Sequence, residues 1–98
     1  MLTSKQRALL RAMCNGTETI FQIGKDGVND NQLAQIRAAL EARELIKLRV
    51  LDSAPYTARE ACDEICAAVE GEPVQVIGTR FCIYKRAEKP ENRRIKLV

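Results

Sequence analysis

Two glycines that bracket a lysine and an aspartate are the first candidate for chemistry in the sequence, at Gly24-Lys25-Asp26-Gly27. The tetrapeptide lies between a strand pattern and the start of a helical pattern, where free backbone amides and the helix dipole favour an anion such as phosphate. KH domains use a GxxG loop to clamp a nucleic-acid backbone. The motif alone is weakly specific, and a glycine-bounded turn remains the simpler interpretation.

Basic residues on two predicted strands are the second candidate for phosphate binding. Lys47 and Arg49 alternate along one strand, and Arg80 and Arg86 fall on the same side of the pleat in another. These side chains could follow a phosphate backbone, or they could simply form a solvated sheet face. Tyr84 lies on the same face, where it could stack on a base, although we expect it to pack beneath a helix.

Missing residue types exclude several enzyme classes. The chain has no histidine, which removes Ser-His and Cys-His catalysis and histidine-bound metals. Its four cysteines, Cys14, Cys62, Cys66 and Cys82, include no CxxC pair. Without a secretory signal they are expected to be reduced and buried rather than joined in disulfides. The sequence therefore predicts no catalytic residues, no metal and no cofactor.

Charge is distributed unevenly along the 98 residues, although the net charge is only +3. Residues 60–72 carry five acidic and no basic side chains, whereas residues 73–98 carry seven basic and two acidic ones. Such asymmetry is typical of a protein that meets a polyanion on one side. An ordinary charged surface with a basic tail would have the same composition.

Hydrophobic periodicity predicts one α/β domain with the order α-β-α-β-α-β-β. The expected helices cover about residues 5–14, 29–42 and 57–70, and the expected strands cover 19–23, 45–50, 74–77 and 80–86. Thr3 or Ser4, Asn29 or Asp30, and Thr57 with Glu60 are the expected helix caps. Right-handed crossovers make the first two strands parallel, and the Gly78-Thr79 hairpin completes a mixed four-stranded sheet. Residues 1–86 form the expected domain, and residues 87–98 a mobile basic tail.

Alternation along the four strands separates an apolar face of the sheet from a mixed, basic one. The apolar face is expected to contain Phe21, Ile23, Ile46, Leu48, Val50, Val74, Val76, Phe81 and Ile83. At least one helix must cover this face. The opposite face is either open to a ligand or partly covered by the first helix, and the pattern does not decide between these alternatives.

Three stretches together resemble the CRM RNA-binding domain, most closely its short single-domain bacterial YhbY-like members. They are IGKDGV at 23–28, ARELIKLRVL at 42–51 and VQVIGTRFCIYKR at 74–86, and the resemblance covers about residues 2–86. It implies a fold similar to the C-terminal domain of translation initiation factor three, with a GxxG loop that contributes to RNA binding. Arg43 stands where the family commonly has histidine, Asn29 replaces a frequent threonine, and Phe81-Cys82-Ile83 replaces a more leucine-rich strand.

The resemblance implies a non-enzymatic protein that binds structured ribosomal RNA during assembly of the large ribosomal subunit. The residues expected to contact RNA are Lys5, Gly24, Lys25, Asp26, Gly27, Lys47, Arg49, Arg80, Lys85 and Arg86. We expect a monomer in the cytoplasm, because no apolar run is long enough for a membrane span and the first residues show no signal. The alternative is a protein-interaction module that docks through the acidic third helix or the basic tail.

Overall fold

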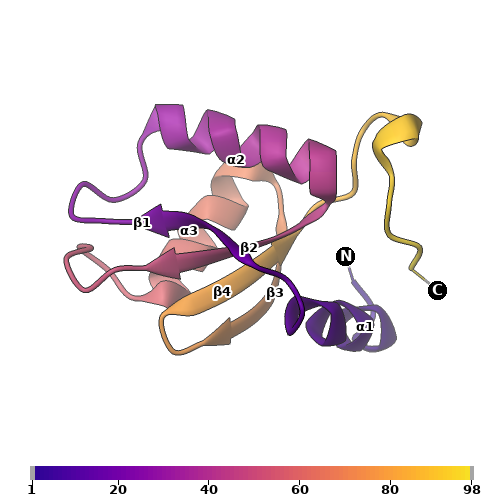
Figure 1. The fold of residues 1–98 in the computed structure, drawn as a ribbon, viewed down its shortest axis with the longest axis horizontal. Helices are drawn as coiled ribbons and strands as arrows, with labels where there is room; N and C mark the ends of the chain where they lie inside the picture. The colour runs from indigo at the N-terminus through magenta and orange to yellow at the C-terminus, as the bar shows by residue number, and fades with distance from the viewer. Residues whose placement is uncertain (1, 98) are drawn as a thin grey trace.

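The elements follow one another along the chain in the predicted order and end in a short 3-10 helix (Figure 1). The structure is a computed structural model that describes residues 2–97. Its elements are α1 (Ser4–Cys14), β1 (Thr19–Ile23), α2 (Asp30–Arg43), β2 (Leu45–Val50), α3 (Ala58–Val69), β3 (Glu72–Ile77), β4 (Arg80–Tyr84) and η1 (Pro90–Asn92). Within residues 2–97 no helix is long and apolar enough to cross a membrane.

Each long helix begins where the sequence supplies a side-chain cap. Thr3 and Gln6 form a capping box at α1, in which each side chain bonds the backbone amide of the other residue. Thr57 and Glu60 do the same at α3, and the Asn29 side chain caps α2. These bonds satisfy amides that have no partner within the first helical turn. The predicted helix starts are confirmed.

The four strands form one mixed sheet in the order β1-β2-β4-β3. β1 pairs with β2 in parallel, and β4 pairs antiparallel with both β2 and β3. Gly78 has φ +58° in the turn between β3 and β4, a conformation that suits glycine at the first central position of a type II′ turn. The predicted fold class and strand pairing are confirmed.

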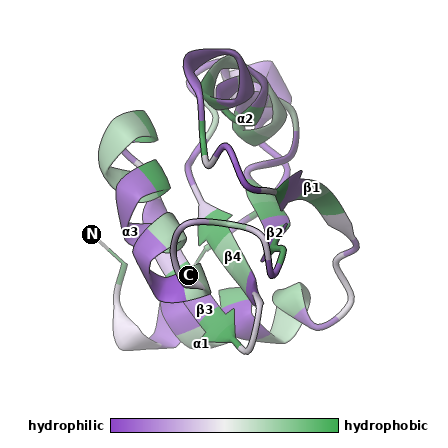
Figure 2. Ribbon diagram, turned by 90° about the vertical axis from the view of Figure 1, so that its left-hand side faces the viewer, coloured by the Kyte–Doolittle hydropathy of each residue, from purple (hydrophilic) through white to green (hydrophobic). Residues whose placement is uncertain are grey.

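Helices α2 and α3 cover one face of the sheet and form the main hydrophobic core with it. Ile36 and Leu40 from α2, with Ile65 from α3, pack against Leu48 and Phe81 of the sheet, and all five are buried. Figure 2 shows β4 largely green, while α2 and α3 alternate between green and purple. This amphipathic pattern is what a sheet between covering helices and solvent requires.

Helix α1 covers part of the opposite face, which answers the question that the pattern left open. Leu10 and Cys14 of α1 pack in a second buried cluster with Leu45, Cys82 and Tyr84. Tyr84 therefore packs beneath a helix, as expected.

The prediction for Val74 is wrong, because this side chain lies in the second cluster rather than on the apolar face with Val76. The pairing of β3 with β4 shifts register between Pro73 and Gln75. Such an irregularity places one extra residue on one strand and reverses the side to which that residue points. Strict alternation therefore fails at the start of β3.

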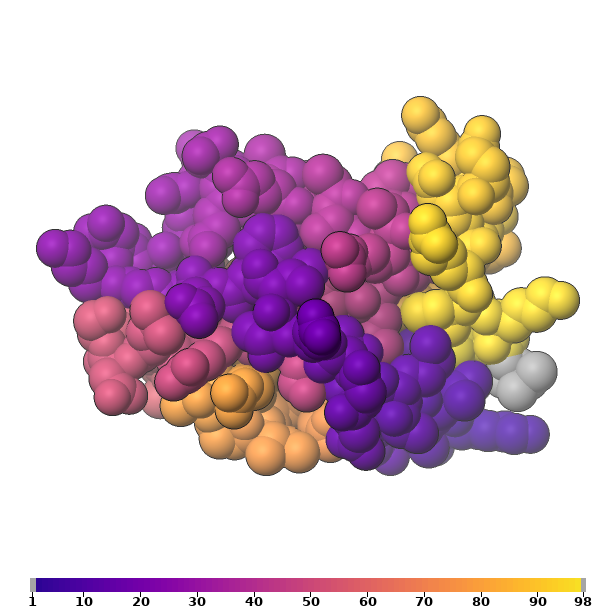
Figure 3. Space-filling view, in the orientation of Figure 1, coloured from indigo at the N-terminus to yellow at the C-terminus, as the bar shows by residue number. Residues whose placement is uncertain are grey.

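The C-terminal segment, residues 87–97, lies against the domain at the place where the sequence predicts a mobile basic tail. The buried Glu44 carboxylate accepts backbone N–H bonds from Ala87, Arg94 and Ile95, at 2.6–2.9 Å. Ile95 and Leu97 then pack against the second cluster. Figure 3 shows the C-terminal segment, in yellow, beside α1 at one end of the long axis.

Candidate nucleic-acid interface

The Gly24–Gly27 loop is an exposed turn between β1 and α2. The Gly27 amide donates to the Gly24 carbonyl at 3.0 Å, and the side chains of Lys25 and Asp26 are exposed to solvent. Gly27 has φ +68°, a backbone conformation that favours glycine. The loop lies at the opposite end of the molecule from the C-terminal segment (Figures 1 and 3). It therefore presents a lysine and open backbone at one tip of the domain.

Tyr56 holds the α2 side of this loop, and sequence reasoning did not single it out. Its hydroxyl accepts the Val28 N–H at 2.9 Å. A Cβ atom at Gly27 would lie 3.2 Å from that hydroxyl and 3.6 Å from Cγ of Pro55. The sequence signal for this contact is weak, because it consists of one aromatic residue that follows Pro55. Gly24, in contrast, has open space, because a Cβ atom there would meet no atom nearer than 3.9 Å.

The two glycines should therefore respond differently to substitution by alanine. Gly27→Ala is expected to lower the free energy of unfolding by about 1–2 kcal/mol, because of the positive φ and the crowding by Tyr56. Gly24→Ala should change it by less than about 0.5 kcal/mol. Urea denaturation followed by circular dichroism measures both values, and equal losses would contradict the geometry. It follows that Gly24 is the cleaner position for testing ligand contacts.

A row of side chains crosses the sheet beside the loop. Arg49 of β2 lies opposite Gln22 of β1 and opposite Arg80 of β4, and Arg80 in turn lies opposite Ile77. The row forms here because β1 and β2 are parallel and end together, where the β3–β4 hairpin also turns. We call this region, the Gly24–Gly27 loop with the row formed by Gln22, Arg49, Arg80 and Ile77, the loop end.

Arg49 and Arg80 give the loop end a concentrated positive charge. Like charges directly opposite one another on neighbouring strands destabilise a sheet, so an anion held between them would relieve the repulsion. Nε of Arg49 is buried and has no hydrogen-bond partner among the described residues. Ile77 is 63% exposed next to Arg80. Two guanidinium groups beside a glycine loop with free backbone amides are groups that bind phosphate oxygens.

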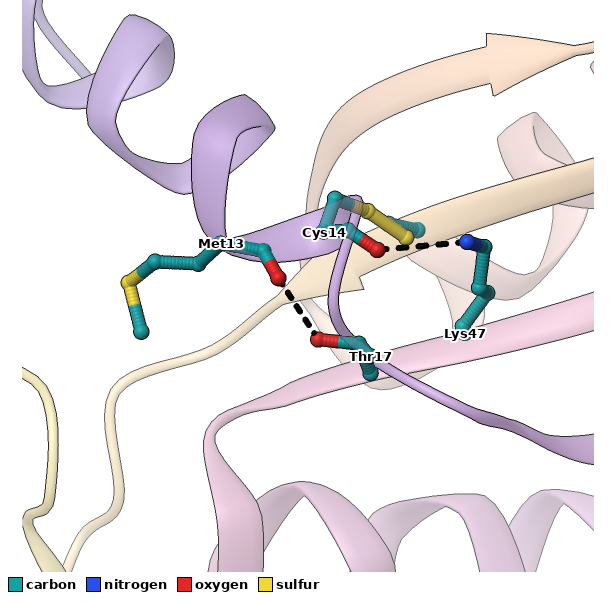
Figure 4. Close-up of a disulfide and its surroundings, with 5 residues drawn as sticks. Met13, Cys14, Thr17 and Lys47 are labelled. Carbon is teal, nitrogen blue, oxygen red and sulfur yellow. Dashed lines mark hydrogen bonds between the residues drawn. A yellow bond between two sulfur atoms is a disulfide. The ribbon is translucent and has the colours of Figure 1, made fainter.

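Lys47 lies one row further from the loop and already has a partner. Its Nζ donates to the Cys14 carbonyl at 3.2 Å, and so it satisfies one of the free carbonyls at the end of α1 (Figure 4). Thr17 donates to the Met13 carbonyl beside it. Lys47 thus positions α1 on the sheet, and its charge borders the loop end.

Cys14 and Cys82 form a disulfide in this same contact, which corrects the expectation that all four cysteines are reduced. Their Cα atoms lie 6.5 Å apart although 68 positions separate them in the sequence. The pairing was not predictable because it depends on how α1 docks against β4. Cys62 and Cys66 are free and buried, as expected. A hydrogen bond with Cys62 and burial raise the pKa of the Cys66 thiol, so it stays protonated.

Three of the predicted RNA-contacting residues lie away from the loop end. Lys85 donates to the Val69 carbonyl at 3.0 Å and thereby bonds the last residue of α3. Arg86 follows β4 at the opposite end of the sheet, and Lys5 is exposed in the first turn of α1. Only the residues of the Gly24–Gly27 loop, with Arg49 and Arg80, are brought together, and Lys47 borders them.

The part of the chain that the structure describes contains no group of three or more cysteine, aspartate or glutamate residues arranged to hold a metal ion. Burial, with the nearby charge of Glu44, raises the pKa of Tyr84, so its hydroxyl is neutral at physiological pH.

The chain is similar to known proteins over nearly its whole length. The model of the CRS1 / YhbY (CRM) domain matches residues 2–85. "Probable RNA-binding protein YqeI" of Bacillus subtilis is 42% identical over 97 residues, or 99% of both chains. "Probable RNA-binding protein PA4753" of Pseudomonas aeruginosa is 27% identical over 89 residues, 91% of this chain and 86% of that protein.

A solved structure shares the fold. The solution structure of the protein SAV1595 from Staphylococcus aureus superposes with a TM-score of 0.77 at 38% sequence identity, over 98% of this chain and 100% of that one. The resemblance seen in the three sequence stretches is thereby confirmed over nearly the whole length. By sequence and by fold, the chain belongs to the CRS1/YhbY (CRM) domain family.

Proposed function

We propose that this protein binds structured ribosomal RNA through its loop end and acts in assembly of the large ribosomal subunit. The observation that carries the proposal is the placement of Arg49 and Arg80 opposite each other, beside the Gly24–Gly27 loop. The names of the YqeI and PA4753 relatives describe RNA binding, which supports the same chemistry here. The large subunit is proposed from the resemblance to single-domain bacterial YhbY-like proteins.

The proposed contact is mainly with the RNA backbone. Gly24 has no side chain to keep a phosphate away, Lys25 adds charge, and the guanidinium groups of Arg49 and Arg80 bind phosphate oxygens. Phosphate contacts position a protein on RNA but carry no sequence information, so recognition would depend on RNA shape. In this proposal the protein is a monomer without catalytic activity and acts in the cytoplasm.

Charge reversal at the loop end tests the proposal. The double variant Lys25→Glu/Arg80→Glu is expected to bind large-subunit ribosomal RNA at least about tenfold more weakly at low salt. The slope of log affinity against log salt should fall by about 2, because two phosphate contacts are lost. Filter binding over a salt series measures both quantities. Sucrose-gradient sedimentation of tagged protein in lysate then shows whether it travels with large-subunit precursors.

The matched control is Arg43→Glu/Lys89→Glu, which changes the net charge equally at exposed positions away from the loop end. This control should retain most of the affinity and should co-sediment with the precursors. Equal losses in both double variants would show that net charge rather than the loop end determines binding. Wild-type protein that stays at the top of a low-salt gradient would refute the ribosomal proposal. Capture of a protein partner that survives ribonuclease would favour the interaction-module alternative.

A further inference from the structure

A second basic site lies at the other end of the domain, between the C-terminal segment, the start of α1 and the end of β4. It is an open pocket of about 760 Å³, which is within the size range of small-molecule sites. Four basic residues line it: Arg86, Arg93, Arg94 and Lys96. Leu2, Ile95 and Leu97 supply its apolar lining. We call this the tail pocket.

The charge of the tail pocket is not neutralised by its own lining, which includes no acidic residue. Arg93 and Arg94 are held in place by carbonyls, since their Nε atoms donate to Ala87 at 2.9 Å and to Ala42 at 2.7 Å. Each guanidinium keeps further N–H donors for a ligand. Among the described residues, neither Arg86 nor Lys96 has a hydrogen-bond partner for its side chain. The pocket lining therefore carries an excess of positive charge, with the buried Glu44 carboxylate near Arg93 as its acidic neighbour.

Tyr84 contributes a polar group to the wall of the tail pocket. The residue is only 6% exposed, and its side chain lines the tail pocket. Its hydroxyl makes no hydrogen bond to any residue in the described part of the chain. Among the described residues the buried side-chain polar atom without a partner is Nε of Arg49, so the Tyr84 hydroxyl is open to solvent through the pocket. A polar ligand atom would replace the water at this hydroxyl.

The backbone around the tail pocket is already arranged. Glu44 lies beneath the C-terminal segment. Its carboxylate accepts hydrogen bonds from the backbone amides of Ala87, Arg94 and Ile95, and these bonds fix the segment in place. Glu41 accepts the amides of Glu88 and Lys89 in the same way. A pocket whose walls are held before binding loses little entropy when a ligand enters.

We propose that the tail pocket binds a nucleotide, with its phosphate on Arg86 and Lys96 and its base against the apolar lining. Guanidinium and ammonium groups match phosphate oxygens, and an apolar surface matches the face of a base. The nucleotide could be a free mononucleotide or one residue of an RNA strand. The second source rests on the proposed function, because the same strand would also contact the loop end.

Titration of the full chain, labelled with ¹⁵N and followed by amide chemical shifts, tests this assignment. The probes are adenosine 5′-monophosphate, inorganic phosphate and a short single-stranded RNA. We expect the monophosphate to shift amides of residues 84–97 and to bind about tenfold more tightly than inorganic phosphate, because the base adds apolar contact. Arg86→Glu/Lys96→Glu should weaken that binding at least about tenfold.

Tyr84→Phe separates binding from folding. It removes a hydroxyl that bonds no described residue, so stability should hold while affinity for the nucleotide falls about threefold or more. Arg11→Glu/Arg59→Glu is the charge-matched control on the exposed faces of α1 and α3, and it should bind the nucleotide normally.

Each outcome decides the proposal. Tail-pocket shifts with the free monophosphate support it with a free nucleotide as ligand, and shifts with RNA alone support it with an RNA strand as ligand. Inorganic phosphate that binds as tightly as the monophosphate would overturn the nucleotide assignment. The absence of shifts in residues 84–97 with every probe would overturn the site itself. RNA binding at the loop end is tested separately, by the RNA affinity of Lys25→Glu/Arg80→Glu.

Discussion

Glu44→Ala is expected to lower the free energy of unfolding by about 2–4 kcal/mol and to release the C-terminal segment. Glu44 is 0% exposed and is the acceptor for the amides of Ala87, Arg94 and Ile95. Without the carboxylate those donors must remain unpaired or the segment must leave the domain, which would expose Ile95 and Leu97 to water. Urea denaturation measures the loss of stability. Amide hydrogen exchange over residues 87–97 shows whether it is local.

Glu41→Ala is the matched control. Glu41 also accepts two backbone amides of the C-terminal segment and the Asn92 side chain, but it is only partly buried. Water can replace it, so its removal should cost less stability than removal of Glu44. Glu44→Ala protein with wild-type stability and protected amides in residues 87–97 would contradict the anchoring role.

The pH dependence of stability gives a second measurement of the same anchor. Burial opposes ionisation of Glu44, but the three backbone hydrogen bonds and the charge of Arg93 outweigh it, so the pKa lies below the usual value of 4.5. The stabilisation is therefore fully present above pH 4.5 and is lost as pH falls through the lower, folded-state pKa. Wild-type protein should lose more stability over this acid range than Glu44→Ala.

Reduction of the Cys14–Cys82 disulfide is expected to lower the free energy of unfolding by about 2–4 kcal/mol. The bond closes a loop across a separation of 68 positions and so restricts the unfolded chain. It also joins α1 to β4 beside Lys47, so its loss should loosen the cover over one face of the sheet. Urea denaturation with and without a thiol reductant measures the difference.

The double variant Cys14→Ala/Cys82→Ala is the control, because its stability should not depend on the reductant. Alkylation of the unfolded, non-reduced wild type should label two thiols, Cys62 and Cys66, and four after reduction. Four labelled thiols without reductant would show that the bond is not formed. Identical denaturation midpoints in both conditions would show that it does not stabilise the fold.

Local signals in the sequence determined the elements and their order. The capping boxes at Thr3 and Thr57 begin α1 and α3, because each threonine hydroxyl accepts the free backbone amide three residues further on. Gly78 turns the hairpin for an equally local reason, its positive φ. Right-handed crossover then leaves one arrangement for β1 and β2. The family resemblance and the Gly24–Gly27 loop were visible for the same reason, because their residues are close together in the sequence.

Contacts between distant positions were decided only by the tertiary structure. Glu44 reaches residues more than forty positions away, and Cys14 meets Cys82 across most of the chain. No local pattern encodes such pairs, because they depend on how α1 and the C-terminal segment dock on the finished sheet. A shift of register moved Val74 to the other face, since alternation holds only while strands pair regularly. Composition alone identified the basic residues, but the strand order placed Arg49 and Arg80 beside the loop and Arg86 at the opposite end.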